Sequence, residues 1–301
     1  MEFQHVDVFA TEAFTGNSLT VFIGDEYIGD GSLSAAQLLA ITREFRHFES
    51  AFLTATGSPS HWRARIFDLA GELDFAGHPL LGAAAVLHDR LGGDGGDGAR
   101  TWSMQLAART VQVETRRSGH GYHASMDQGR PEFGRSVTGQ DLSPVLEGFG
   151  LRPADLAPGP DPAVVSTGLR YLVLPVTAAA LAQARIVVTD LGDRLSALGA
   201  QFAYLLDVRG MEGRHWDNEG DAEDIATGSA AGAVGAYLVQ YELVGANEAF
   251  VLHQGRFAGR ASQLRVTPEG SAAEISRVLV SGEVAVVAKG ILTVLPGTPS
   301  H

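Results

Sequence analysis

One glutamate in the sequence, Glu49, has the setting in which a carboxyl group can carry out acid/base chemistry. It lies between Phe48 and Phe52, at the start of a strand-like run. Burial between bulky apolar residues raises the pKa of a carboxyl group toward the range that is useful for proton transfer at neutral pH. A buried ion pair would give the same pattern, and the local spacing alone favours neither interpretation.

Two glycine-led helix starts have the composition of anion-binding sites. Gly77 and His78 open one predicted helix, and Gly228 and Ser229 open another, just after Asp224. The first turn of a helix presents backbone N–H groups and the positive end of the helix dipole. If both starts line one cleft, a carboxylate can bind there without lysine or arginine. Ordinary helix capping is the alternative for either start taken alone.

The residue types that are absent restrict the chemistry. The chain contains no cysteine, which excludes disulfides, thiolate nucleophiles and cysteine-based metal sites. Lys289 is the only lysine and has no neighbouring motif, so it is a poor candidate for a Schiff base. Gly93–Gly98 formally fits a dinucleotide-binding pattern, but it follows a predicted helix where a strand is required. We expect no cofactor and no metal.

Composition places the chain among globular proteins. The 301 residues are 45% hydrophobic and 19% charged, which suffices for two domains with a substantial core. The net charge is −13 and no basic stripe stands out, so nucleic acid is not an expected partner. No uninterrupted apolar stretch reaches the roughly 18 residues of a membrane span, and the first residues lack a signal-peptide pattern. We expect a cytoplasmic protein without membrane association.

Two predicted helices, Pro79–His88 and Ser229–Val239, consist almost wholly of small and apolar residues. A helix that is apolar all round must be buried all round. When residues 77–87 are aligned with residues 228–238, a glycine, an alanine and a leucine match, and both segments follow an acidic turn. The pattern indicates two copies of one domain, each with a helix at the axis of a shell of strands.

The remaining elements are mostly short strands. One surface helix is predicted over Ser34–Phe45, where Ser34 and Gln37 have the spacing of a capping box. We place the two domains at residues 1–120 and 121–296, followed by a tail at 297–301, and the last strand, near 290–296, can return to the first domain. The predicted strands are Phe3–Phe9, Leu19–Ile23, Trp62–Phe67, Thr110–Glu114, Tyr171–Val176, Gln263–Val266 and Glu283–Val287.

Several segments, in a fixed order along nearly the whole chain, carry a resemblance to one known family. They are Val6–Phe9 with Phe14–Asn17, Glu49–Phe52, Gly71–Glu72 with Gly77–Pro79, Thr167–Leu169, Glu223–Gly232, and Gln254–Arg256 with Gly259–Arg260. Together they resemble the phenazine-biosynthesis PhzF-like isomerases. The glutamate, the Gly-His-Pro and the acidic Thr-Gly-Ser-Ala-Ala-Gly segment are the specific part of this resemblance.

The resemblance implies an α+β fold of two similar domains, each a curled, mostly antiparallel sheet around a central buried helix, as in diaminopimelate epimerases and proline racemases. Those relatives use a pair of cysteines, and this chain fits the branch that uses a glutamate. In that branch the residue that matches Glu49 shuttles a proton, while those that match His78 and Asp224 polarise the substrate or handle its second proton. The implied substrate-binding residues are Asn17, Ser50, Gly77, Gly228 and Ser229.

The resemblance leaves the substrate open. Its namesake activity is isomerisation of trans-2,3-dihydro-3-hydroxyanthranilate, so we expect a small cyclic or amino carboxylate and, from the family's tendency, a homodimer. Ser18 and Ile225 depart from the family pattern, which commonly has proline at both positions. Two alternatives remain: an epimerase or racemase with Glu49 and Asp224 as its two bases, and a carboxylate-binding protein without catalysis. A fold alone does not decide among them.

Overall fold

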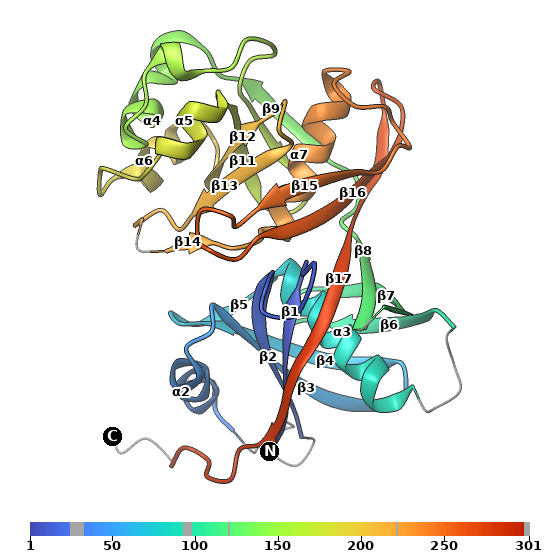
Figure 1. Cartoon of the computed structure of the whole chain (residues 1–301). Coiled ribbons are helices and arrows are strands. Elements are labelled where there is room, and N and C mark those ends of the chain that lie inside the picture. The colour runs from blue at the N-terminus through green and yellow to red at the C-terminus, as the bar shows by residue number, and fades with distance from the viewer. Residues whose placement is uncertain (25–32, 93–97, 120, 221, 298–301) are drawn as a thin grey trace. The chain divides into compact units, whose positions relative to one another are not determined.

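The computed structural model describes residues 1–24, 33–92, 98–119, 121–220 and 222–297 (Figure 1). Most of the segment Gly93–Gly98 and most of the predicted tail therefore lie outside the described residues. The chain forms two compact units. Unit 1 comprises Met1–Asp127 together with Ser281–His301, and unit 2 comprises Gln128–Val280. The division expected from the sequence, between residues 120 and 121, lies a few residues earlier.

Unit 1 is a mixed β-sheet that closes on itself. Its strands are β1 (Glu2–Val8), β2 (Asn17–Ile23), β3 (Glu49–Ser58), β4 (His61–Asp68), β5 (Glu72–Leu73), β6 (Arg100–Gln105), β7 (Thr110–Ser118), β8 (Gly121–Asp127) and the second part of β17 (Ile275–Ile291). The pairing runs β17–β1–β2–β3–β4–β6–β7–β8 and returns to β17. The pairs β2–β3 and β4–β6 are parallel. A closed sheet satisfies its strand edges internally.

A buried helix fills the interior of this closed sheet. Helix α3 (Gly77–Leu91) is buried at every residue from Gly77 to His88 and contacts strands β1, β2, β3, β6, β7 and β8. A methyl group at Gly82 would lie 2.5 Å from a methyl carbon of Leu19, so the small residues let the strands approach the helix closely. The sequence of α3 therefore matches its burial on all sides.

A second helix covers the outside of unit 1. Helix α2 (Ala35–Phe45) begins after Ser34, whose side chain forms the predicted capping box with Gln37. Its buried residues pack on aromatic rings of the strands in one cluster. The members of this cluster are Met1, Phe22, Leu38, Ile41, Phe52 and Phe67.

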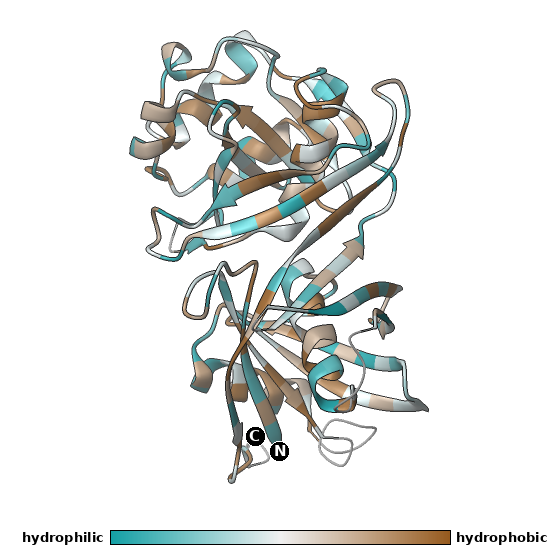
Figure 2. Cartoon of the chain, turned by 45° about the vertical axis from the view of Figure 1, so that its right-hand side comes forward, coloured by the Kyte–Doolittle hydropathy of each residue, from teal (hydrophilic) through white to brown (hydrophobic). Residues whose placement is uncertain are grey.

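Unit 2 is a second mixed sheet. Its strands are β9 (Glu132–Ser136), β10 (Ala163–Ser166), β11 (Arg170–Pro175), β12 (Phe202–Asp207), β13 (Glu212–Trp216), β14 (Glu223–Asp224), β15 (Phe250–Gln254), β16 (Ser262–Gly270) and the first part of β17. The order is β9–β10–β11–β12–β13–β15–β16, with parallel pairs β11–β12 and β13–β15. Helix α7 (Gly228–Gln240) contacts β10, β11 and β16. Hydrophobic and hydrophilic residues alternate along strands such as β16 in Figure 2.

Short helices pack on another side of the unit 2 sheet. They are α4 (Ser143–Gly148), α5 (Ala178–Gln183) and α6 (Leu191–Ala197), with 3₁₀ turns η1 (Gly139–Asp141) and η2 (Pro153–Asp155). Residues of all three α-helices join one buried cluster with β10, β11 and β12. The sequence analysis missed these helices because each has only six or seven residues, too few for a helical period to stand out, and tertiary packing stabilises them. Among the described helices, none combines the length and apolar character that a bilayer span requires.

Candidate active site

In unit 1, a buried carboxyl group and a buried imidazole lie in contact. Glu49 is the first residue of β3, and His78 is the second residue of α3. Oε2 of Glu49 lies 3.2 Å from Nδ1 of His78, and the two side chains are only 14% and 6% exposed. The closed sheet brings the start of β3 against the start of the helix inside it. Two groups that can exchange protons are thus held together away from bulk water.

Nδ1 of His78 has a second polar neighbour. Nδ2 of Asn17 lies 3.4 Å from it. An amide nitrogen can only donate a hydrogen bond, whereas a carboxylate oxygen can only accept one. A protonated Nδ1 can therefore donate to Glu49, whereas an unprotonated Nδ1 can accept from Asn17.

Asn17 is placed by the glycine before it. Gly16 has a φ of +72°, and a Cβ atom there would lie 2.5 Å from the carbonyl oxygen of Val8. Only glycine fits this turn, which delivers Asn17 to the first position of β2 with 1% of its surface exposed. The neighbouring Ser18, where the family commonly has proline, places its hydroxyl 3.4 Å from Nδ1 of His47.

Ser50 follows Glu49 on β3 and is fully buried. Its hydroxyl makes no hydrogen bond to any part of the chain that the structure describes. Successive strand residues point to opposite faces of a sheet, and Phe52 packs in the cluster under α2. The Ser50 side chain therefore shares the outer face, opposite Glu49. A role of Ser50 in substrate binding falls to its backbone.

The start of α3 has the features of an anion-binding helix terminus. Its N-cap is Ala76, which offers no capping side chain, and its first turn contains no acidic residue. The N–H groups of a helix start without a side-chain cap attract negative charge, and so does the dipole. Gly77 and His78 therefore place a helix terminus without a side-chain cap next to the Glu49 carboxyl group.

In unit 2, Asp224 stands before the start of α7. It pairs with His215 in the register of β14 and β13. Its Oδ2 accepts a hydrogen bond of 2.6 Å from the hydroxyl of Thr227, and its Oδ1 lies 3.4 Å from the amide nitrogen of Ala226. Thr227 is the N-cap of α7 but makes no side-chain cap bond, since its hydroxyl is directed to Asp224. The first turn of α7 is left without a side-chain cap, as in α3.

Gly228 and Ser229 are held by polar side chains from other strands. The hydroxyl of Ser229 lies 2.8 Å from that of Tyr171, and the carbonyl of Gly228 accepts a 2.8 Å hydrogen bond from Gln128. The hydroxyl of Thr167 donates to Oε1 of Gln128 at 2.8 Å. The segment Thr167–Leu169, which the sequence analysis could only match to a family pattern, thus helps to fix the first turn of α7.

His215 is a buried neutral imidazole at neutral pH. Burial lowers the pKa of His215 below its ordinary value, and the charge of Asp224 offsets part of that shift. Its Nδ1 donates a 3.0 Å hydrogen bond to the carbonyl oxygen of Ala203. Sequence reasoning gave no role to His215, because a lone histidine in a strand carries no motif.

The structure thus groups the predicted site residues within each unit. In unit 1 it brings together Glu49, His78 and Asn17, beside Gly77, and turns the Ser50 side chain away. In unit 2 it places Asp224 within the turn that leads into Gly228 and Ser229. The polar residues that hold these groups were not assigned from sequence, although Gln254 belongs to a matched segment. They are Gln128, Tyr171, Tyr204 and Gln254.

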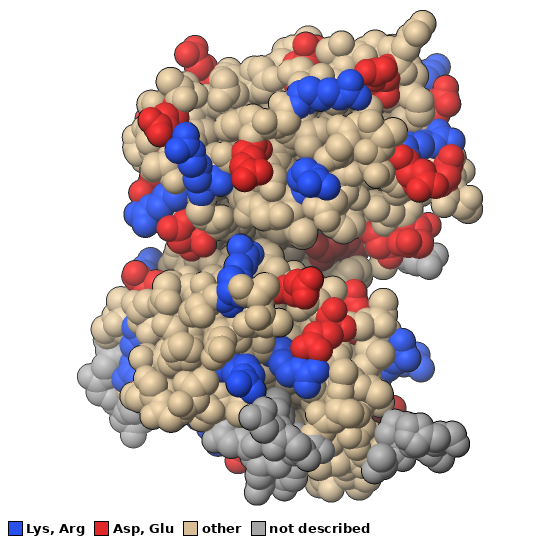
Figure 3. All heavy atoms as spheres, turned by 180° about the vertical axis from the view of Figure 1, so that it is seen from behind, with Lys and Arg blue, Asp and Glu red and all other residues tan. Residues whose placement is uncertain are grey.

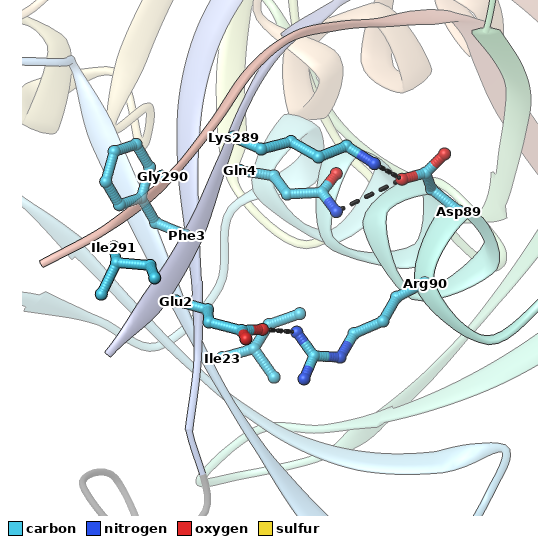
Figure 4. Close-up of a pocket in the computed structure, with 9 residues that line it drawn as sticks. All are labelled: Glu2, Phe3, Gln4, Ile23, Asp89, Arg90, Lys289, Gly290 and Ile291. Atoms are coloured by element: carbon cyan, nitrogen blue, oxygen red, sulfur yellow. Dashed lines mark hydrogen bonds and ion pairs between the residues drawn. The ribbon is translucent and has the colours of Figure 1, made fainter.

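A pocket of about 580 Å³ in unit 1 lies at the opposite end of α3 (Figure 4). Asp89, which lines it, is 11 residues beyond His78, or about 16 Å along the helix. The charges of this pocket neutralise one another, because Lys289 pairs with Asp89 at 2.5 Å and Arg90 pairs with Glu2. It has neither a poised acid nor an unpaired cation for a carboxylate, and it is not the predicted site.

The charged side chains and the metal-ligating side chains are also relevant to the sequence-based expectations. On the face drawn in Figure 3, acidic and basic side chains are interspersed and form no single-sign stripe. No group of three or more histidine, cysteine, aspartate or glutamate side chains among the described residues has the arrangement of a metal site.

Comparison with known proteins gives a consistent result. The model of the family described as "Phenazine biosynthesis-like protein" matches residues 6–290. An uncharacterised isomerase of Salmonella typhimurium, YddE, is 30% identical over 94% of this chain and 95% of its own length. The trans-2,3-dihydro-3-hydroxyanthranilate isomerase of Pseudomonas aeruginosa is 29% identical over 95% of this chain and 96% of its own. A solved structure described as a predicted epimerase, also from Pseudomonas aeruginosa, is 48% identical with a TM-score of 0.87, covering 97% of this chain and 99% of that one.

Proposed function

The chain belongs to the phenazine biosynthesis-like protein family, and on that premise we propose that it is an isomerase that moves a proton on a small carboxylate-bearing substrate. Glu49 is the acid/base, and His78 and Asp224 assist it. The reaction needs no redox cofactor, because removal and return of a proton leave the oxidation state of the substrate unchanged. The contact of 3.2 Å between the buried side chains of Glu49 and His78 carries this proposal.

Two further features support the role of Glu49. A C–H proton beside a carboxylate or an enamine is weakly acidic, so the charge that develops on its removal must be stabilised in place. The first turn of α3 supplies N–H groups at that point, with Gly77 leading it and no side-chain cap competing for them. The 3.2 Å contact places the Glu49 carboxyl group beside an imidazole, which suits a carboxyl group that alternates between base and acid.

The resemblance adds residues of unit 2 to the proposal. Asp224 polarises the substrate or takes part in its second proton transfer, and the α7 start at Gly228 and Ser229 contributes to carboxylate binding. The absence of a side-chain cap on α7 supports this role. Asn17 orients His78, and Ser50 contributes through its backbone.

The proposed activity is tested with the purified protein and trans-2,3-dihydro-3-hydroxyanthranilate, the substrate that names the Pseudomonas aeruginosa relative. Conversion is followed by proton NMR in ordinary and deuterated water. We expect a change in the position of the ring double bond that requires active protein. If no substrate in a library of small cyclic and amino carboxylates is converted or exchanges a proton, the chain is a binding protein and the isomerase proposal is wrong.

A second candidate is an epimerase or racemase, which the description of the 48% identical structure favours. That reaction requires a base on each face of a carbon atom, and Glu49 and Asp224 are the candidates. The two reactions differ in deuterated water. An epimerase incorporates deuterium at a stereocentre and inverts it without moving a double bond, whereas the isomerase changes the bonding pattern.

Assembly as a homodimer and a cytoplasmic location, both expected from the sequence, remain part of the proposal. Sedimentation equilibrium of the full chain tests the first of these. A mass of twice 31.7 kDa is the expected result.

A further inference from the structure

We propose that Gln254 is a positioning residue that fixes the orientation of the Asp224 carboxylate through the hydroxyl of Thr227. Gln254 is the last residue of β15 and is 1% exposed. It belongs to a segment that matched the family pattern without a role. This inference rests on the proposed function, since it gives Asp224 a defined orientation for the reaction.

All four hydrogen-bonding positions of the Gln254 amide are used. Nε2 donates to the carbonyl oxygen of Asp224 and to the hydroxyl oxygen of Thr227, both at 2.9 Å. Oε1 accepts from the backbone N–H of Thr227 at 3.1 Å and from the hydroxyl of Tyr204 at 3.0 Å. A carbonyl can only accept and a backbone N–H can only donate, so these partners fix which end of the amide is nitrogen.

The direction of the next hydrogen bond follows from this assignment. The hydroxyl oxygen of Thr227 receives a proton from Gln254, so its own single proton is available for one acceptor. That acceptor is Oδ2 of Asp224, at 2.6 Å. The chain of donors therefore runs from Gln254 through Thr227 to Asp224 in one direction only. With Oδ2 held by the threonine proton and Oδ1 3.4 Å from the amide nitrogen of Ala226, the orientation of the Asp224 carboxylate is fixed.

The backbone around Gln254 is shaped for this contact. Gly255 has a φ of +83°, and a Cβ atom there would lie 2.5 Å from the carbonyl oxygen of Ile225. Only glycine lets the end of β15 approach the turn between Asp224 and Thr227 so closely. On the other side, Gly213 leaves room for the Tyr204 ring, because a methyl group there would lie 2.4 Å from its hydroxyl oxygen. Gly255 and Gly213 thus both make room for the contacts of the buried Gln254 amide.

Two substitutions break this chain of hydrogen bonds at different points. Gln254→Met keeps the length and burial of the side chain but removes every donor and acceptor. Thr227→Val removes only the hydroxyl and keeps the shape. A small misplacement of a reacting group can cost about 100-fold in rate. We expect each variant to lower kcat by about 10- to 100-fold and to change KM by less than about 3-fold.

Tyr237→Phe provides the matched control. Tyr237 lies on the same helix α7, is fully buried, and its hydroxyl donates to the carbonyl oxygens of Pro160 and Asp161. Its loss removes a buried hydrogen-bonding group that has no link to Asp224. The Tm of this variant should fall about as much as that of Gln254→Met, while its kcat stays at the parental value.

The same substitutions in an Asp224→Asn background test whether Gln254 acts through Asp224. Residues that act as one unit are not additive, so adding Gln254→Met to Asp224→Asn should lower kcat by less than about 3-fold more. If Asp224→Asn alone keeps the parental kcat, the role of Asp224 in the proposed function is wrong. If Asp224→Asn is slow but Gln254→Met and Thr227→Val are parental, the positioning role is overturned and the proposed function stands.

A readout without substrate completes the test. At constant pH, the carbon-13 resonance of the Asp224 carboxyl group should shift in Gln254→Met and in Thr227→Val and stay in place in Tyr237→Phe. If the parent protein does not turn over trans-2,3-dihydro-3-hydroxyanthranilate, the shift of this resonance alone tests whether Gln254 positions Asp224. An unshifted signal in both variants overturns the inference.

Discussion

His78 places its Nδ1 atom 3.2 Å from Oε2 of Glu49, and the same nitrogen lies 3.4 Å from the amide of Asn17. The histidine therefore lies between the Glu49 carboxylate, which can accept a hydrogen bond from Nδ1–H, and the Asn17 amide, which can donate one to an unprotonated Nδ1. In the proposed function, this arrangement lets His78 contact Glu49 from the start of α3.

Replacing His78 by alanine should lower turnover more than binding. Alanine has no side-chain atom beyond Cβ, so the Glu49 carboxyl group loses the imidazole that lies 3.2 Å from it. A positioned acid/base typically contributes about 10²- to 10⁴-fold, and we expect a loss of kcat near the lower end of that range. Steady-state kinetics with the identified substrate measure it. A parental kcat in His78→Ala would show that Glu49 works without this contact.

The stability of the protein should fall as the pH drops below the ordinary histidine pKa, in part because of His215. Burial lowers the pKa of His215 in the folded state, whereas in the unfolded chain it is near 6.5. Between these values the unfolded state binds more protons, so the free energy of unfolding decreases with falling pH, by at most about 1.4 kcal/mol per pH unit for this group.

The variant His215→Asn isolates this contribution. Asparagine keeps a donor for the carbonyl of Ala203 but does not titrate in this range. Urea unfolding at pH 7.5 and pH 5.5 should show a smaller loss of stability in the variant than in the parent protein. Equal losses in the two proteins would assign the pH dependence to other groups.

Arg214 and Glu223 form a buried ion pair next to Asp224. Their side chains are 9% and 12% exposed, with 2.6 Å between Nη2 and Oε2. Arg214 also donates to the carbonyl oxygens of Leu181 and Ala184 at the end of α5. Removing one partner leaves an uncompensated buried charge, so Glu223→Gln should lower the free energy of unfolding by about 3 kcal/mol or more.

The control for this pair is Arg256, which forms an ion pair of 2.7 Å with Glu212 while 62% of its side chain is exposed. Exposed pairs contribute little, because water and salt screen them. Arg256→Gln should leave urea unfolding nearly unchanged. A similar effect of Arg256→Gln and Glu223→Gln would contradict the distinction between buried and exposed charge.

Gly16→Ala should destabilise unit 1 and reduce turnover by displacing Asn17. Gly57→Ala is the matched substitution, since Gly57 also has a positive φ, +88°, but a Cβ atom there meets nothing within 4 Å. The control measures backbone strain alone, about 1–2 kcal/mol. Gly16→Ala adds the clash with the Val8 carbonyl and should cost more in urea unfolding. Equal costs would mean that this turn can relax.

Local sequence patterns predicted the elements that have a strong local signal. The all-apolar composition of residues 79–88 and 229–239 matches helices α3 and α7, and the capping box of Ser34 marks the start of α2. The resemblance pointed to Glu49 and His78, which are separated by 28 residues of intervening chain. No periodicity contains that information.

Two features could not be predicted from the sequence, for the same physical reason: the closure of the unit 1 sheet and the hydrogen bonds of Gln254 around Asp224. Strand β17 pairs with β1 across nearly the whole chain, with Glu2 opposite Ile291. Gln254 reaches Asp224 from 30 positions away. Such contacts arise from tertiary packing, and a buried glutamine or arginine within a strand gives no sign of its partner.

The proposed proton transfer by Glu49 is tested most directly by the Glu49→Gln variant in deuterated water. Glutamine keeps the shape and hydrogen-bonding reach of the side chain but cannot accept the substrate proton. With the substrate identified for the parent protein, we predict that incorporation of deuterium falls by about 10²- to 10⁴-fold in the variant, while substrate binding changes little. Exchange at a near-parental rate in Glu49→Gln would contradict the account, and the base would then be His78 or Asp224.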